Sequence, residues 1–415
     1  EGDGVEVDWD QLQGKAVVKE TPWNPFGQGG RMEARKEKMP GGEAKGLASN
    51  QSSVVGLVVV TLGSGKHAGA ASEIIATALR EEGVKGVEFK IDQKVGDMMG
   101  NSLKSIRDYL RITYEPKGMV PDGYQVSIVF QDRDQRVDGP SAGTAMALML
   151  DSLFTGEKLD EGFACTGGIT PNGKVTSIGG VAAKIRGATR RDCTIVGVPE
   201  GNAKGVNDIL VLDGVQQLLD IQVFTMKDMD EARALSREEK DKDVQSTLDD
   251  FKSVADIIAE QGEAALKNAR VKERLEAVLE AMPNHISAKL LLDHIRGDAP
   301  ERLSVGGSFH EIDSRSSAVF SRVQRTMMRG KVSEADEAES AAADAREELE
   351  ELDGKIHEKF EDYLKAAIDI CKTVEEDASN GGKDLVENLK SRWSKINSIR
   401  KKLRDDPEVF EELRG

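Results

Sequence analysis

The pattern of apolar residues changes near residue 230, and this change limits the chain to a two-part architecture. Before it, short apolar runs alternate with helical patterns, as at residues 54–62, 87–91, 124–130 and 194–199. After it, apolar residues recur every three or four positions and strand patterns nearly vanish. Interspersed strands and helices indicate an α+β or α/β unit, whereas the helical period indicates amphipathic helices. We therefore predict an α+β domain followed by an all-α helical domain.

A length of 415 residues supports more than one domain, because a single ordinary core does not grow that large. Frequent Pro and Gly at residues 1–52 predict an extended N-terminal arm, with one short charged helix at 31–38. The predicted domains are then residues 53–235 and 236–415. Further predicted segments are helices at 71–82, 98–110, 141–153, 181–190, 318–328, 332–370 and 385–403, strands at 163–169 and 221–225, and a turn-rich link at 297–307.

Composition excludes several classes of function. The formal net charge is −17, and residues 231–415 hold 42 acidic against 31 basic residues, so nucleic acid is not expected as the main partner. The longest apolar run, 54–62, is too short to span a membrane. Three cysteines (Cys165, Cys193 and Cys371) lie far apart, and no His, Cys and carboxylate cluster has metal-ligand spacing. We expect neither a metal nor a cofactor.

The segment Gly63-Ser64-Gly65-Lys66 resembles part of a phosphate-binding loop but lacks two required residues. Val60 stands where such a loop needs its first glycine, and His67 stands where a Ser or Thr should follow the lysine. We interpret the segment as a flexible turn after a strand, and we expect no nucleotide-driven motor.

The strongest local signal is the run Asp138-Gly139-Pro140-Ser141-Ala142-Gly143, which directly precedes an apolar helix. Gly and Pro impose a sharp turn, so Ser141 is placed at the helix N-terminus, where free N–H groups can stabilise an oxyanion. An N-cap serine on a buried helix is the commoner origin of such a pattern. The turn alone therefore does not decide between a nucleophilic serine and an N-cap serine.

The turn at Ser141 resembles the nucleophile motif of the Lon proteases, and other segments resemble that family in the same order over roughly residues 53–235. These segments are Val95-Gly-Asp-Met-Met99, Thr166-Gly-Gly-Ile-Thr170, Gly173-Lys-Val175, Ile178-Gly-Gly-Val-Ala-Ala-Lys184 and Val196-Gly-Val-Pro199. The resemblance implies a Lon-type proteolytic domain with Ser141 as nucleophile, Lys184 as general base and Thr166 beside the lysine. We assign the oxyanion hole to the Ser141 N–H and the turn at Asp138 and Gly139.

This resemblance implies a serine–lysine peptide hydrolase that works through an acyl-enzyme. Free lysine has a pKa of ~10.4, so burial must lower the pKa of Lys184 before it can accept a proton. The rival function is a non-catalytic scaffold or peptide-binding module with the same fold, and a third is a nucleic-acid-associated relative. Because Ser141 and Lys184 are both present and ATPase motifs are not, we favour an ATP-independent endopeptidase acting on unfolded or flexible polypeptides.

The sequence also leads to expectations about assembly and compartment. The family usually forms rings, so the resemblance implies a homo-oligomer, with a hexamer as the specific expectation. A chain that begins at Glu1 rather than Met favours a periplasmic or secreted protein over a cytoplasmic one. We expect the helical half to assist assembly or substrate access and to supply no catalytic residue.

Overall fold

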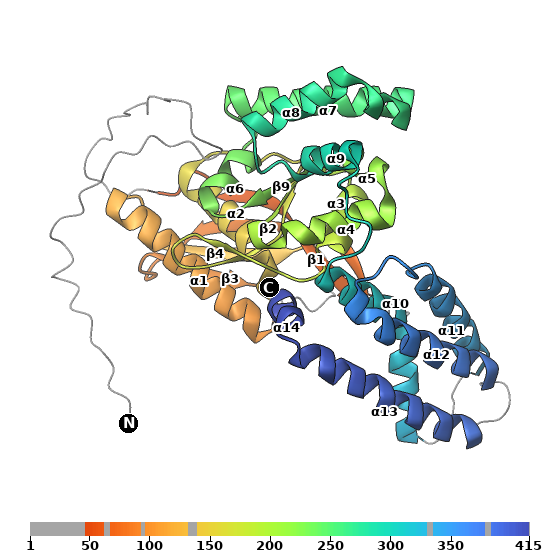
Figure 1. Ribbon diagram of the computed structural model, residues 1–415. Coiled ribbons are helices and arrows are strands. Elements are labelled where there is room, and N and C mark those ends of the chain that lie inside the picture. The colour runs from red at the N-terminus through yellow and green to blue at the C-terminus, as the bar shows by residue number, and fades with distance from the viewer. Residues whose placement is uncertain are drawn as a thin grey trace.

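The computed structural model describes residues 46–61, 67–92, 96–131, 139–329, 335–377 and 383–414. Several sequence predictions fall outside these residues: the charged helix at 31–38, most of the N-terminal arm, the turn at Gly63 to Lys66, and Asp138. The described part contains a mixed sheet, helices on both of its faces and a separate bundle of long helices (Figure 1).

A seven-stranded sheet forms the centre of the first part, in the order β3-β4-β2-β1-β5-β8-β9. The strands are β1 (Gln51–Thr61), β2 (His67–Arg80), β3 (Val87–Ile91), β4 (Tyr124–Phe130), β5 (Phe163–Cys165), β8 (Ile195–Pro199) and β9 (Gln222–Met226). β2 pairs antiparallel with β1 and β4, and the other neighbours are parallel. A small hairpin joins β6 (Gly168–Ile169) to β7 (Val175–Thr176). This mixture of pairings confirms the predicted α+β class.

The helix predicted at residues 71–82 is wrong, because this segment is the second half of strand β2. Ile74, Ala76 and Ala78 are buried in alternation, which is the period of a strand rather than of a helix. The apolar pairs in this segment satisfied a helical spacing as well, and only pairing with β1 and β4 decides between the two.

Each face of the sheet buries its own hydrophobic cluster, because neighbouring strand residues point to opposite sides. Val54 and Cys165 face the first cluster, whereas Val55 and Ala164 face the second. The first cluster packs against α1 (Asp97–Tyr114), α2 (Gly143–Thr155) and α6 (Met229–Ser236). The second packs against α3 (Val181–Thr189), α4 (Ala203–Asp213) and α5 (Val215–Asp220). Short 3-10 turns lie at η2 (Glu115–Lys117), η3 (Pro140–Ala142) and η4 (Glu200–Asn202).

The first three long helices after residue 236 pack on the sheet unit rather than apart from it. They are α7 (Lys242–Gln261), α8 (Ala269–Ala281), which follows η5 (Glu263–Lys267), and α9 (Ile286–Arg296). Phe251 of α7 is fully buried in the second cluster, and Asn284, just before α9, hydrogen-bonds the backbone of Thr225 in β9. These helices therefore extend the layer that α3, α4 and α5 form (Figure 1).

The remaining helices form a bundle with its own core. They are α10 (Val305–Arg329), α11 (Ala335–Glu350), α12 (Glu361–Asp377, preceded by η6, Glu358–Phe360), α13 (Lys383–Asp405) and α14 (Pro407–Arg414). Phe320, Phe360 and Tyr363 are buried in this third cluster. The buried residues before about residue 300 therefore belong to the first two clusters, and those after it belong to the third. The sequence instead places a domain boundary at 235/236. The boundaries at 52/53 and 235/236 stay predictions.

The single helix predicted at residues 332–370 is wrong, since α11 and α12 are separate helices. Gly354 adopts a left-handed conformation (φ 73°) in the connection, and the His357 side chain accepts a hydrogen bond from the Lys359 N–H at the start of the next helical segment. The helices predicted at 318–328 and 385–403 are confirmed and are longer than expected. α10 begins at Val305 and so includes the end of the predicted 297–307 link.

Candidate active site

Ser141 lies in a tight turn at the start of the buried helix α2. Gly139 has φ 119°, a conformation that residues with a Cβ rarely adopt, and η3 follows it directly. α2 then buries nearly every side chain, beginning with Gly143 and Thr144. The Ser141 side chain is only partly buried at the edge of this packing. The sequence prediction of a sharp turn that leads into a buried helix is confirmed for Gly139 to Thr155.

The backbone of Ser141 is fixed by the segment that follows β5. Its carbonyl accepts hydrogen bonds from the Gly167 N–H (2.8 Å) and the Thr166 hydroxyl (3.1 Å). One turn later, the Thr144 N–H donates to the Gly167 carbonyl at 2.9 Å. A Cβ on Gly143 would come within 3.2 Å of the Ile169 nitrogen, which is tighter than most such contacts, so glycine favours this close approach. These contacts hold the backbone of Ser141 in one position.

Lys184 is buried on α3, where only 3% of the residue is exposed. Burial disfavours the ammonium form and lowers the pKa of Lys184 to about 7. Buried lysines are rare unless they are paired, so an amine in this setting is a candidate for proton transfer. A pKa near neutrality leaves a large neutral fraction, which is the state that can accept a proton.

Two glycines let α3 lie directly on the backbone of strand β2. A Cβ on Gly69 would stand 1.7 Å from the Ala183 carbonyl oxygen, and one on Gly187 would stand 2.7 Å from the Ala70 nitrogen. No side chain fits between the helix and the strand at these points. The height of α3 above the sheet, and with it the depth of Lys184, is set by backbone contact.

Strand β1 contacts both Thr166 and the helix that carries Lys184. The Thr166 hydroxyl contacts the Ser141 carbonyl and lies 3.5 Å from the Leu57 carbonyl of β1, and α3 packs on β1 and β2. Among the described residues, no hydrogen bond joins the Lys184 amine to the Ser141 hydroxyl or to Thr166. Catalytic hydrogen bonds of this kind often tighten only when substrate is bound. The role predicted for Thr166, orienting the lysine amine, stays a prediction.

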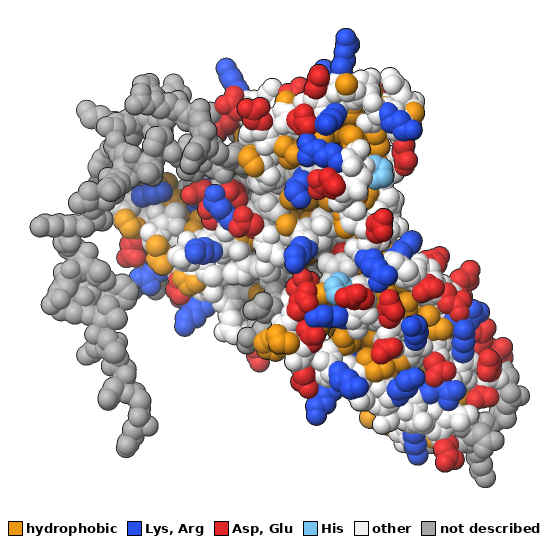
Figure 2. Space-filling view, viewed as in Figure 1, with side chains coloured by type: hydrophobic (Ala, Val, Ile, Leu, Met, Phe, Trp, Pro, Cys, Tyr) orange, Lys and Arg blue, Asp and Glu red, His pale blue; other side chains and the backbone are white. Residues whose placement is uncertain are grey.

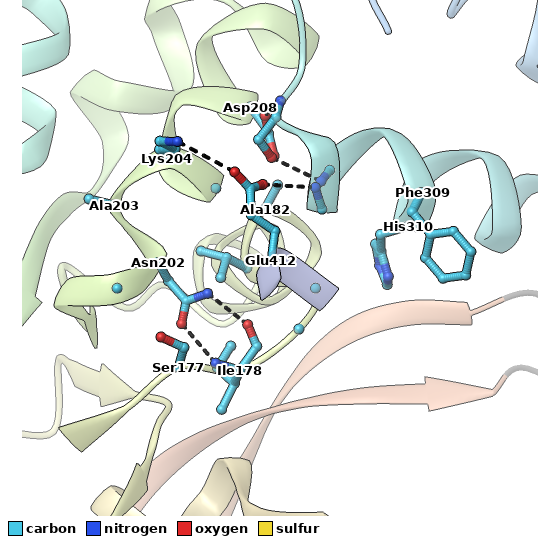
Figure 3. A pocket seen from close by; sticks show the side chains of 18 of the residues that line it. Ser177, Ile178, Ala182, Asn202, Ala203, Lys204, Asp208, Phe309, His310 and Glu412 are labelled. Carbon is cyan, nitrogen blue, oxygen red and sulfur yellow. Dashed lines mark hydrogen bonds and ion pairs between the residues drawn. The ribbon is translucent and has the colours of Figure 1, made fainter. Parts of the chain in front are cut away.

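Sequence reasoning missed a cleft of about 760 Å³ beside the first turn of α3 (Figure 3). Gly180 and Val181 of the α3 start line one wall, and Phe309 and His310 of α10 line another. Lys204 and Glu412, more than two hundred residues apart, form an ion pair at 3.5 Å across it. No local pattern could reveal this cleft, because residues far apart in the chain create it.

A family profile described as the Lon protease (S16) C-terminal proteolytic domain matches residues 43–235. Residues 43–235 are a Lon-type proteolytic domain. This segment contains Ser141, Thr166 and Lys184, and the match confirms the resemblance found in the sequence.

Lon proteases from several bacteria are similar in sequence to this chain. Lon protease 1 of Bacillus subtilis is 37% identical over 119 residues, which are 28% of this chain and 15% of that protein. Lon protease 1 of Herpetosiphon aurantiacus is 36% identical over 124 residues, 29% of this chain and 15% of its own length. A Lon protease of Mycolicibacterium smegmatis is 32% identical over 146 residues, 35% of this chain and 18% of that protein. The chain thus covers less than a fifth of the length of these relatives.

Metal sites and membrane-spanning helices have requirements that the described residues do not meet. Within the described residues, no three His, Cys, Asp or Glu side chains gather closely enough to hold a metal ion. No helix in the same residues has both the length and the apolar character needed to cross a membrane. Figure 2 shows acidic and basic side chains mixed over the same helices on the visible face.

Proposed function

We propose that this protein is a serine endopeptidase in which Ser141 is the nucleophile and Lys184 the general base. The observation that carries the proposal is the buried Lys184, whose pKa of about 7 suits proton transfer at neutral pH. It lies on a helix packed against β1, and β1 also contacts Thr166 beside the Ser141 turn. Membership of residues 43–235 in a family of proteases supports this assignment.

The proposed reaction proceeds through an acyl-enzyme. The Ser141 Oγ attacks the carbonyl carbon of the peptide bond while its proton moves to the neutral Lys184 Nζ. The resulting ammonium then protonates the leaving amine, so the C–N bond breaks and Lys184 is neutral again. Water repeats the sequence against the acyl-enzyme, with Lys184 taking its proton, and this step releases the acid product and restores Ser141.

The first turn of the helical segment offers the groups that the oxyanion needs. N–H groups in the first turn of a helix have no acceptor within that helix, so those at Ser141 can donate to a developing oxyanion. The left-handed Gly139 shapes this turn, and the two hydrogen bonds to the Ser141 carbonyl keep the peptide plane in place. We assign the oxyanion hole to this turn, with Asp138 and Gly139 as supporting residues.

The substrates we propose are unfolded or flexible polypeptides. The sequence contains no nucleotide-binding motif with which this chain could pull a folded protein apart. We further propose a ring-shaped homo-oligomer, with residues 1–52 as an arm, 53–235 as the proteolytic domain and 236–415 as an accessory to assembly or access.

Hydrolysis of casein is expected to need neither ATP nor magnesium. The segment Gly63-Ser64-Gly65-Lys66 has Val60 and His67 where a phosphate loop needs a glycine and a hydroxyl residue. Treating the purified protein first with apyrase and afterwards with EDTA should leave the rate of casein hydrolysis unchanged. Activity that disappears under this treatment and returns on addition of ATP and magnesium would contradict the prediction.

A covalent probe tests the proposed function directly. We expect a fluorophosphonate to form an adduct on Ser141, located by mass spectrometry of peptides, and its rate to rise as pH increases through about 7. The sign follows from the chemistry, because only the neutral lysine formed above its pKa can take the serine proton. A rate independent of pH, or an adduct on another residue, would argue against the dyad.

The non-catalytic scaffold is the alternative function. It predicts that the protein binds peptides through the same fold but never forms the Ser141 adduct. An intact mass that stays unchanged after prolonged exposure to the probe, together with measurable peptide binding, would favour the scaffold.

A further inference from the structure

The helix that carries Lys184 is held from outside the Lon-type domain. Arg186 lies two residues after Lys184 on α3, and its guanidinium is mostly buried, with 23% of the side chain exposed. Its Nε donates to Asp213 at the end of α4 (2.7 Å), and its Nη1 donates to Glu311 of α10 (3.1 Å). α3 is therefore tied to its own domain and also to the helical bundle.

Glu311 is itself rigidly placed. Its side chain is 7% exposed, and each carboxylate oxygen has a different partner: Oε1 binds Arg186 and Oε2 binds Arg315 at 3.1 Å. Arg315 in turn contacts Glu351 at 3.2 Å and the Glu348 carbonyl of α11. A carboxylate with low exposure and two charged partners keeps one geometry, so it can fix the position of the arginine it binds.

A second contact, which does not involve Glu311, holds the start of α10 against α4 (Figure 3). The Asp208 carboxylate accepts the Ser304 N–H at 2.7 Å and the Ser304 hydroxyl at 2.8 Å. A Cβ on Gly307 would come within 2.0 Å of the same carboxylate, so only glycine allows this contact. Because the Asp208–Ser304 contact does not involve Arg186, the bundle should stay packed on α4 when the Glu311 contact is removed.

We propose that Glu311 is a positioning residue for Lys184, acting through Arg186. Contact with β2 fixes how high α3 lies above the sheet, and the Arg186–Glu311 pair fixes how the helix is rotated and placed along it. The helical bundle thereby helps to keep the lysine amine buried and directed into the site. This inference rests on the proposed serine–lysine function, and it gives the bundle a role in the chemistry beyond assembly or access.

The test compares two variants that change the local charge in opposite directions. Glu311→Gln removes a negative charge near α3, and Arg186→Gln removes a positive one. If charge alone mattered, the first would lower the pKa of Lys184 and the second would raise it. If positioning matters, α3 loosens and Lys184 becomes hydrated in both variants, so both midpoints of the pH–rate profile move upward.

We expect fluorophosphonate labelling of Ser141 to slow about tenfold in each variant, because small displacements of catalytic groups cost large factors in rate. Both pH midpoints should rise by about half a unit or more. The double variant should be no slower than the slower single variant, because both single changes already break the same Arg186–Glu311 contact. The matched control is Glu375→Gln, which breaks the Arg346–Glu375 pair (2.7 Å) between α11 and α12 and should label like the wild type.

Several results would overturn the proposal. These are a wild-type rate and midpoint in Glu311→Gln, midpoints that move in opposite directions in the two single variants, or a loss in Glu375→Gln as large as in Glu311→Gln. Failure of the proposed function looks different, because the wild-type protein itself would then form no adduct on Ser141.

Discussion

Replacing Ser141 with alanine should abolish casein hydrolysis and fluorophosphonate labelling while leaving the fold intact. Loss of the nucleophile removes the acyl-enzyme route, and losses of about 10³-fold or more are typical for such residues. The fold should persist because the contacts that hold this turn use the backbone carbonyl of Ser141, not its hydroxyl. Casein hydrolysis, probe labelling and the midpoint of thermal unfolding are the three measurements.

Ser177→Ala is the matched control for this prediction. Ser177 is also a partly buried loop serine of the Lon-type domain, and it lines the cleft beside α3 rather than the Ser141 turn. We expect this variant to keep its activity and its labelling. Activity near the wild-type level in a clean preparation of Ser141→Ala would exclude Ser141 as the nucleophile.

The elements that could be predicted from the sequence are those whose pattern fits only one structure. Strand β4 was expected at the residues it occupies, since Tyr124 to Phe130 alternate and end at clear breaks. Strand β2 was misassigned because Ile74 and Ile75 fit both periods, and its identity depends on two pairing partners distant in sequence. The break at Gly354 was missed inside a charged stretch whose helical pattern continues on both sides.

The candidate site also has features that local sequence predicts and features that depend on residues distant in the chain. Ser141 could be predicted because Gly139, Pro140 and the apolar helix lie next to it in the chain. The burial of Lys184 was expected, but its cause, the contact of α3 with β2 at Gly69, joins residues more than a hundred positions apart. Arg186 and Glu311 gave no local signal, because each resembles an ordinary charged residue on a helix surface until the two helices are packed.

Replacing Lys184 with methionine should abolish activity and at the same time make the protein more stable. Activity is lost because methionine cannot take the Ser141 proton. Stability increases because the wild type buries an amine whose pKa falls from 10.5 to about 7, whereas methionine fills a similar volume without a charge to desolvate. The difference of about 3.5 pKa units corresponds to roughly 3–5 kcal/mol of unfolding free energy.

The pH dependence of this gain identifies its cause. Between about pH 7 and 10.5 the unfolded wild type binds more protons at Lys184 than the folded protein, so its stability rises with pH over this range. The advantage of Lys184→Met should therefore be full below about pH 7 and shrink toward pH 10. Thermal unfolding of both proteins at about pH 6 and pH 10 measures this, with a difference of several degrees expected at the lower pH.

Lys204→Met, which replaces a lysine whose side chain is 77% exposed, should show no such gain. An equal gain at both pH values would trace the effect to packing, and a gain absent at pH 6 would mean that Lys184 is not buried as a neutral amine.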